Sequence, residues 1–173
     1  MASKESLYFS GIIVGDAKNE KTSLREKLGE YETLDTTHTG PFELIQHEFK
    51  LEKKKVQISL WTIDSSSENW RIIRGAYYND ASGAIIVFDS TEKNWIDELK
   101  FWVKEIKRAN TKITMVLVHN LIEKEENDST QIREIIAEKI FKRYKKKFSI
   151  VELKSISNKE IEEIYLALCE NKL

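Results

Sequence analysis

The stretch from Gly11 to Leu24 constrains the fold more than any other part of the chain. Its apolar residues 12–14 predict a buried strand, Gly15 breaks that strand, and Lys21-Thr22-Ser23 opens a predicted helix. In a loop of this kind the backbone N–H groups surround a phosphate, a lysine supplies positive charge, and a Ser or Thr hydroxyl binds Mg²⁺. The order strand, loop, helix therefore indicates a phosphate-binding loop.

This loop departs from the usual pattern, G-x-x-x-x-G-K-[ST], at one fixed position, because Glu20 replaces the second glycine. A carboxylate there lies next to the anion that the loop would bind, and it removes the residue best able to adopt positive φ. Two interpretations stay open: a working site, or an empty loop in which Lys18 and Glu20 form an internal ion pair. The candidate phosphate-binding residues are Gly15, Asp16, Ala17, Lys18, Asn19, Glu20, Lys21, Thr22 and Ser23.

Strand-like and helix-like runs alternate along the rest of the chain. Short apolar runs predict six strands, and apolar residues at helical spacing predict the helices. The strands are expected at residues 7–14, 42–51, 56–61, 83–88, 113–118 and 148–153, and the helices at 21–28, 70–78, 95–109, 132–141 and 161–168. Polar stretches and turn residues predict loops at 29–41, 62–69 and 122–129.

The alternation of strands with helices implies an α/β fold in a single domain, residues 1–173. Parallel strands joined by right-handed crossovers are expected, together with one antiparallel strand, because a short charged turn joins 42–51 to 56–61. The apolar run 83–88 is typical of a strand covered on both faces. We predict a mostly parallel six-stranded sheet with helices on both faces.

Charge and cysteine usage argue against several classes of protein. With 28 basic and 29 acidic residues the net charge is −1, so nucleic acid is not an expected partner. The single cysteine, Cys169, excludes an intramolecular disulfide and suits a reducing, cytoplasmic compartment. No apolar run approaches the roughly 20 residues needed to span a bilayer. Ala2 and the last four residues carry no lipidation signal, so we expect membrane contact to be indirect or through a tail outside this sequence.

Several local strings resemble the Ras superfamily of small GTPases, and the Rab branch most closely. Leu24 follows Lys21-Thr22-Ser23 as in the family's G-K-T-S-L string. Residues 75–83, Gly-Ala-Tyr-Tyr-Asn-Asp-Ala-Ser-Gly, and the later Val87-Phe88-Asp89-Ser90-Thr91 are similar to the family's R-A-Y-Y-R-D-A-D-G and V-Y-D-x-T. The resemblance covers nearly the whole chain and implies a P-loop NTPase small G domain that binds GTP or GDP with Mg²⁺.

The resemblance assigns roles to residues of the phosphate loop. It implies that Lys21 contacts the β- and γ-phosphates and that Thr22 binds Mg²⁺. At both positions this chain has the residue type that the family uses. Ala17 stands where a glycine is usual, and its side chain is expected to obstruct the arginine finger of an activating protein.

The same resemblance places the first switch in the loop that follows. Thr39 aligns with the family's threonine that contacts Mg²⁺ and the γ-phosphate, and Thr36 and Thr37 stay open as alternatives because the loop is one residue short. Tyr31 is a candidate to stack on the base. The implied metal ligands are therefore Thr22, Thr39 and an aspartate of the second switch.

The second switch departs most from the family. Members read W-D-T-A-G-Q, whereas residues 61–68 read Trp-Thr-Ile-Asp-Ser-Ser-Ser-Glu. Aligned on the tryptophan, Thr62 takes the place of the Mg²⁺-linked aspartate. Aligned on the acid, Asp64 keeps that role, Ser67 replaces the glycine, and Glu68 takes the glutamine position. Since the glutamine orients the attacking water, either alignment predicts very slow or absent hydrolysis.

Base recognition is also altered. The family's N-K-x-D becomes Asn120-Leu121-Ile122-Glu123, which keeps the asparagine but lengthens the guanine-reading carboxylate by one methylene. Such a carboxylate discriminates between bases only if its reach is right. The later S-A-K loop becomes Ser155-Ile156-Ser157, which keeps the serine and a backbone N–H for the guanine carbonyl. Relaxed base choice therefore stays open beside guanine specificity.

Three other features have a structural interpretation and a functional one. The basic run 142–147 favours a solvated helix end, with an anionic lipid as the alternative. His119 stands where a glycine is usual and is expected to be a tolerated loop residue rather than a catalyst. Trp61 and Trp70 flank the second switch, where one of them is a candidate anchor for a partner.

Two functions from different classes follow. The first is a divergent Rab/Ras-like GTPase that binds guanine nucleotide weakly or persistently and recruits effector or regulatory proteins through residues 31–47 and 62–78, in signalling or membrane traffic. The second is a nucleotide-free pseudo-GTPase, an interaction module with its switches in one fixed shape. Glu20, Ser67 and Leu121 motivate the second function.

Overall fold

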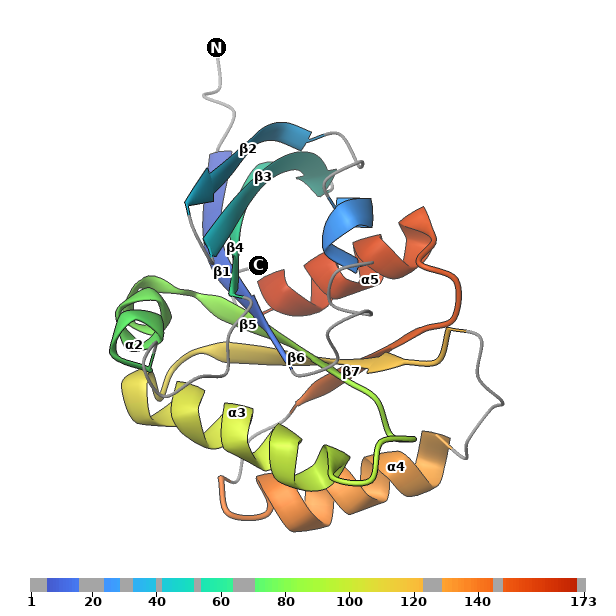
Figure 1. The fold of residues 1–173 in the computed structure, drawn as a ribbon. Helices are drawn as coiled ribbons and strands as arrows, with labels where there is room; N and C mark the ends of the chain where they lie inside the picture. Colours follow the sequence, from blue (N-terminus) through green and yellow to red (C-terminus); the bar gives the residue numbers. More distant parts are fainter. Residues whose placement is uncertain are drawn as a thin grey trace.

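A central twisted sheet with helices on both faces forms the domain in the computed structural model (Figure 1). The structure describes residues 6–15, 24–28, 33–39, 42–51, 54–63, 71–122, 129–144 and 148–170, with the backbone alone at 33–39, 42 and 51. The strands are β1 Ser6–Val14, β2 Thr33–Thr39, β3 Phe42–Leu51, β4 Lys54–Ile63, β5 Gly83–Phe88, β6 Thr114–Asn120 and β7 Ser149–Leu153. The helices are residues 24–28, α2 Arg71–Asp80, α3 Trp95–Ala109, α4 Ser129–Ile136, the π-helix η2 Ala137–Phe141, and α5 Asn158–Cys169.

The sheet order is β2-β3-β4-β1-β5-β6-β7. β1, β4, β5, β6 and β7 pair in parallel, whereas β3 pairs antiparallel with both β2 and β4. β3 is thus the one described strand that runs against the others. The predicted α/β class with a mostly parallel sheet and one antiparallel strand is confirmed.

The sheet has one strand more than predicted, because residues 33–39 form β2 rather than a loop. β2 pairs along the outer edge of β3, with Thr36 opposite Ile45 and Thr39 opposite Phe42. Its sequence, Thr-Leu-Asp-Thr-Thr-His-Thr, is rich in β-branched threonine, which favours a strand. An edge strand has solvent on one side, so it lacks the apolar run that identified the central strands.

Two clusters of buried side chains hold the layers together. On one face, α2, α3 and the segment α4–η2 cover the sheet, and Trp102, Ile106 and Phe141 belong to this cluster. On the other face, residues 24–28 and α5 pack over side chains that include Ile85 and Val116. Figure 1 shows the same division, with α2, α3 and α4 on one side and α5 on the other. The buried strands β5 and β6 contribute alternate residues to both clusters.

Candidate functional site

The sheet order places a topological switch point at the carboxyl ends of β1 and β5. The parallel part of the sheet runs β4-β1-β5-β6-β7, so the chain leaves β1 and β5 in opposite directions along the sheet. The helix at 24–28 lies over one face, and α3, which follows β5, lies over the other. Open α/β sheets bind ligands at such a switch point.

Gly15 is the first residue beyond β1 at this point, and it is buried. Its φ of +141° is one that residues with a side chain rarely adopt. A Cβ built there would lie 2.2 Å from the backbone oxygen of Val87 on β5. The glycine therefore lets the start of the predicted phosphate loop pass directly over β5. Residues 16–23, including Lys21 and Thr22, lie outside the described residues.

The polar side chains just beyond β5 are engaged by their own neighbours. The buried Asp89 carboxylate accepts from the N–H and the hydroxyl of Thr91, at 2.8 and 2.7 Å. Ser90 Oγ lies 2.8 Å from Nε2 of His119, whose ring stacks on Phe88 at 4.8 Å. His119 lies inside β6 and is buried, rather than in a loop as predicted. These contacts give Asp89 and His119 structural roles beside the switch point.

Asn120 ends β6 at the same edge of the sheet and is 1% exposed. Its Oδ1 accepts from the N–H of Ile122 at 3.3 Å. Its Nδ2, also buried, has no hydrogen-bond partner in the part of the chain that the structure describes. A buried donor without a partner costs about 1–3 kcal/mol, so this amide is suited to an acceptor supplied by a ligand.

The loop that follows β7 lies beside Asn120. Asn120 pairs with Leu153 in the sheet, and the N–H of Leu121 donates to the Leu153 oxygen at 2.8 Å. Two residues further on, Ser155-Ile156-Ser157 forms the predicted base loop, with Ile156 at a φ of 53°. The structure therefore brings the predicted residues Asn120 and 155–157 together. Glu123, predicted to read guanine, lies outside the described residues.

The carboxylate of Glu160 holds this loop from within. It accepts from the backbone N–H groups of Lys154 and Ser157, each at 2.6 Å, and from both serine hydroxyls at 3.1 and 2.8 Å. Ser157 caps α5 in return. Although partial burial of the carboxylate opposes it, these bonds lower the pKa of Glu160 to about 2. Among the described residues the N–H of Ile156 has no partner, so it stays available at the tip of the loop.

The Glu160→Gln substitution is expected to lower the free energy of unfolding by about 1 kcal/mol at pH 7, the usual value of a helix cap. A lowered pKa stabilises the fold at pH values above the ordinary 4.5, and this stability is lost as the pH falls toward 2. The difference between wild type and variant should therefore shrink between pH 7 and acid. Urea unfolding followed by tryptophan fluorescence at several pH values measures it. A difference that stays constant with pH contradicts the proposed contact.

The predicted switch residues are described only in part. Thr39 is the last residue of β2, where its backbone alone is described, as it is at Thr36 and Thr37. Thr62, the alternative to an aspartate, is buried in β4, and its hydroxyl lies 3.5 Å from the Glu43 oxygen. Tyr31, Asp64 and Glu68 lie outside the described residues, as does Trp70.

Metal-binding and membrane-spanning features were sought in the described ranges. No group of three or more His, Cys, Asp or Glu side chains lies close enough there to hold a metal ion. None of the helices described is both long and apolar enough to cross a bilayer. The predicted metal ligands Thr22 and Asp64 fall outside these ranges.

The surface of α2 carries apolar side chains toward solvent. Ile72 is 87% exposed and Ile73 is 40% exposed, and both lie within residues 62–78, the second segment predicted to recruit partners. Trp61, at the end of β4, is half-buried and contacts Tyr77 of α2 with ring centroids 5.0 Å apart. Trp61 therefore packs under α2, and the exposed isoleucines are the better candidates for a partner anchor.

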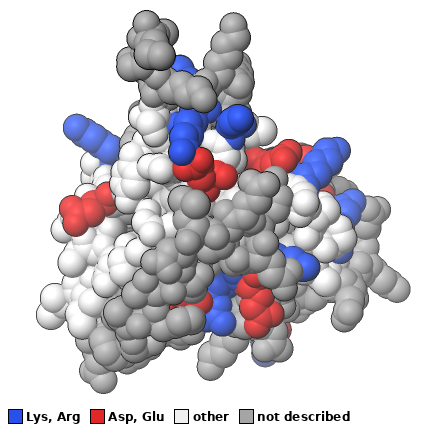
Figure 2. Space-filling model, turned by 90° about the horizontal axis from the view of Figure 1, so that it is seen from above, with Lys and Arg blue, Asp and Glu red and all other residues white. Residues whose placement is uncertain are grey.

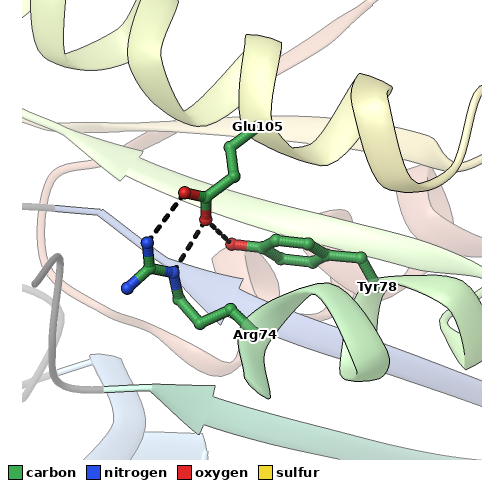
Figure 3. A network of polar contacts seen from close by, with 3 residues as sticks. All are labelled: Arg74, Tyr78 and Glu105. Atoms are coloured by element: carbon green, nitrogen blue, oxygen red, sulfur yellow. Dashed lines mark hydrogen bonds and ion pairs between the residues drawn. The ribbon is translucent and has the colours of Figure 1, made fainter. Parts of the chain in front are cut away.

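A buried polar network, unpredicted from the sequence, fixes α2 against α3 (Figure 3). Arg74 of α2, fully buried, donates two hydrogen bonds to the carboxylate of Glu105 on α3, from Nε and one terminal nitrogen, each at 2.7 Å. The hydroxyl of Tyr78 donates to the same carboxylate at 2.8 Å. The guanidinium also lies 5.5 Å above the ring of Trp102. Burial and the neighbouring carboxylate raise the pKa of Tyr78, which keeps its hydroxyl protonated as a donor.

Comparison with known proteins identifies the family to which the chain is similar. The family model described as the Ras family matches residues 11–173. The chain is 29% identical over 171 residues to the Ras-related protein Rab-21 of Mus musculus, covering 95% of this chain and 73% of the relative. It is 28% identical over 177 residues to the Ras-related protein Rab-8B of Homo sapiens, covering 99% and 81%. The GTP-binding protein ypt3 of Schizosaccharomyces pombe is 30% identical over 114 residues, 65% of this chain and 53% of the relative.

Proposed function

Because the chain belongs to the Ras family, whose members bind GTP or GDP with Mg²⁺, we propose that it is a divergent Rab-like small GTPase. It binds guanine nucleotide weakly or persistently and hydrolyses it very slowly or not at all. In this role it is a switch that recruits partner proteins in signalling or membrane traffic. The family resemblance stated from the sequence is confirmed by these matches, and the altered chemistry is the proposal.

The observation that carries the proposal is a pair of donors at the ends of β6 and β7. Asn120 Nδ2 is buried without a described partner, and the N–H of Ile156 is the one amide of its loop that Glu160 leaves available. Guanine presents two acceptors, N7 and O6, along one edge, whereas adenine presents an acceptor and a donor there. Two donors therefore favour guanine over adenine. Asn120, Ile156 and the phosphate loop are the residues that would hold the nucleotide.

Impaired hydrolysis rests on the sequence of the second switch. Glu68 stands at the position of the water-orienting glutamine, and Ser67 at that of the glycine whose N–H approaches the γ-phosphate. A carboxylate repels the charge that develops on the phosphate, and a serine adds bulk at the point of close approach. Mg²⁺, when bound through Thr22, Thr39 and Asp64, would neutralise charge on the phosphates.

Partner recruitment is proposed through residues 31–47 and 62–78. Proteins of this family bind effectors and regulators, and the exposed Ile72 and Ile73 on α2 lie within the second segment. Large exposed side chains of this type are typical anchors in protein interfaces. We place the protein in the cytoplasm, with contact to membranes only at their periphery.

The test of nucleotide binding is isothermal titration of the purified chain with GDP and with GTP, with and without Mg²⁺. Heat of binding that depends on guanine, with no heat from ATP, is expected. The absence of heat with GDP and GTP at high micromolar concentration would overturn the proposal. A preference for ATP would show that the donors at Asn120 and Ile156 do not select the base.

Replacing Glu20 with glycine is expected to raise the affinity for GDP by about tenfold, roughly 1.4 kcal/mol. The change removes a negative charge beside the phosphates and restores a residue that tolerates positive φ. The matched control is Glu170→Gly, which removes an exposed carboxylate at the C-terminal end of α5, away from the predicted site, and should leave the affinity unchanged. If the Glu20 variant and wild type bind GDP with equal affinity, another position is responsible for the weak nucleotide binding.

One observation favours the second function, a nucleotide-free pseudo-GTPase. The ion pair of Arg74 with Glu105 fixes α2 to α3 through protein groups alone. A helix held in this way keeps one shape whether or not a nucleotide is present. Nucleotide released from the purified protein on denaturation, detected by its absorbance, would exclude this alternative.

A further inference from the structure

A groove of about 680 Å³ lies between α3 and η2. It is on the face of the sheet that α2, α3 and α4–η2 cover, and it is remote from the edge strand β2. We infer that this groove binds an acidic peptide segment of a partner protein, one that carries an aromatic or aliphatic residue between its carboxylates. The inference does not depend on nucleotide binding. It rests on the charge, the floor and the local geometry of the groove.

The rim of the groove is strongly cationic. Among the described residues, five cations line it against one carboxylate, Glu138, and these cations are Lys100, Lys104, Lys139, Lys142 and Arg143. The whole chain, in contrast, has a net charge of −1. On the face that Figure 2 shows, basic and acidic side chains are interspersed. The groove is therefore a local concentration of positive charge on a protein whose overall net charge is slightly negative.

These cations are not neutralised by the described part of the protein. Of the five, Lys100 alone forms an ion pair with a described residue, Asp97, at 3.7 Å, and both side chains are substantially exposed, so this pair contributes little. The other four cations have no ion-pair or hydrogen-bond partner among the described residues. Like charges gathered around one hollow repel each other, and an anionic ligand would relieve that repulsion.

The floor of the groove is apolar. Val103 and Ile140 are buried there, and the rings of Phe101 and Tyr144 are half-buried at its sides. A phosphate headgroup or a free polyphosphate would leave this apolar surface without a matching group. A peptide with an apolar side chain between acidic residues satisfies both the floor and the rim. The chemistry of the groove therefore favours a peptide over a lipid headgroup.

The geometry of η2 contributes to the hollow. Ala137–Phe141 is a π-helix, which places its hydrogen bonds at i→i+5 and widens the turn. Lys139 and Ile140 lie on this turn, and Lys142, Arg143 and Tyr144 follow it directly. Single π-helical turns are rare and occur frequently at functional sites. The surface also continues past α3, because Phe101 and Lys104 line a second hollow of about 440 Å³ between α2 and α3.

The experiment selects binding peptides from a random peptide library displayed on phage, with the full chain as bait. We expect the selected sequences to be acidic and to contain an aromatic or aliphatic residue. A selected peptide, synthesised with a fluorophore, is then titrated against wild type and the Lys139→Glu/Arg143→Glu variant. The variant should bind about tenfold more weakly, and added salt should weaken the wild-type complex.

The matched control is Lys93→Glu/Lys159→Glu, which changes the net charge equally at exposed lysines outside both hollows. This control should bind as wild type does. Tyr144→Ser tests the apolar lining of the groove and should also weaken peptide binding. The urea midpoint of each variant shows whether it is folded. In ¹⁵N spectra of the full chain, the peptide should shift resonances of α3 and η2.

Three results would overturn the inference. The first is a selection without enrichment of acidic peptides. The second is equal binding by the charge-reversed and control variants. The third is binding to vesicles of phosphatidylserine and phosphatidylcholine, about 3 to 7, that the Lys139/Arg143 variant loses while no peptide is selected. That last result would assign the groove to a membrane surface instead.

Discussion

Replacing Arg74 with alanine is expected to lower the free energy of unfolding by about 3–5 kcal/mol. The guanidinium is fully buried, and its removal leaves the Glu105 carboxylate with the Tyr78 hydroxyl as its remaining partner in the network of Figure 3. A charge left in an apolar setting without its counterion costs much more than an exposed ion pair contributes. The variant also loses the contact of the guanidinium with the Trp102 ring.

Urea unfolding at pH 7, followed by tryptophan fluorescence, measures the change in the free energy of unfolding.

The double variant Arg74→Met/Glu105→Leu is the informative control. It removes both charges together and fills their space with apolar side chains, so the unfolding free energy should recover to within about 1–2 kcal/mol of wild type. Glu48→Ala gives a second comparison, because its partner Lys55 is 41% exposed and the loss should stay below about 1 kcal/mol. A loss of less than about 1 kcal/mol in the Arg74 variant would mean that the pair is solvated in solution.

Much of the fold is readable from the sequence because its central elements are defined by burial. The expected helix at 95–109 has the same bounds as α3, and its residues Trp95, Leu99, Trp102, Val103 and Ile106 are all buried as their spacing predicts. The run 83–88 likewise matches β5, which is buried along its whole length. In both cases the hydrophobic period alone identifies the element, since each element buries a face against the core.

The elements that sequence reasoning missed are those whose identity depends on distant partners. β2 is held by its pairing with β3, and its flanking Gly29, Gly40 and Pro41 favour a loop when taken alone. The Arg74–Glu105 pair joins residues 31 positions apart, which no local pattern reveals. A polar residue on a helix is expected to face solvent, so a buried arginine contradicts the rule that identified α3.

In the candidate site, too, some residues have a signal in the sequence and some contacts have none. Asn120 and Ser155-Ile156-Ser157 were found by resemblance, and the pairing of β6 with β7 brings them together. The role of Glu160 had a local signal, since Ser157-x-x-Glu160 is the spacing of a capping box. The contact of Ser90 with His119 had none, because it depends on the register of β5 with β6.

Replacing Gly15 with alanine is expected to lower the free energy of unfolding by about 4 kcal/mol, through backbone strain and overpacking together. The added Cβ would lie 2.2 Å from the Val87 oxygen, and a backbone atom of a central strand cannot move aside as a side-chain end can. Its φ of +141° is strained for alanine in any case. The proposed binding of guanine nucleotide should fall with it, since the predicted phosphate loop starts at this residue.

Gly75→Ala is the matched control for this change. Gly75 lies within α2, and a Cβ there would meet nothing within 4 Å. Since alanine is favoured over glycine inside a helix, this variant should be more stable than wild type by up to about 1 kcal/mol. Urea unfolding of the two variants beside wild type separates the effects of a methyl group at the two positions. If the Gly15 variant stays within about 1 kcal/mol of wild type, Gly15 does not lie as close to the Val87 oxygen in solution, or does not keep its positive φ.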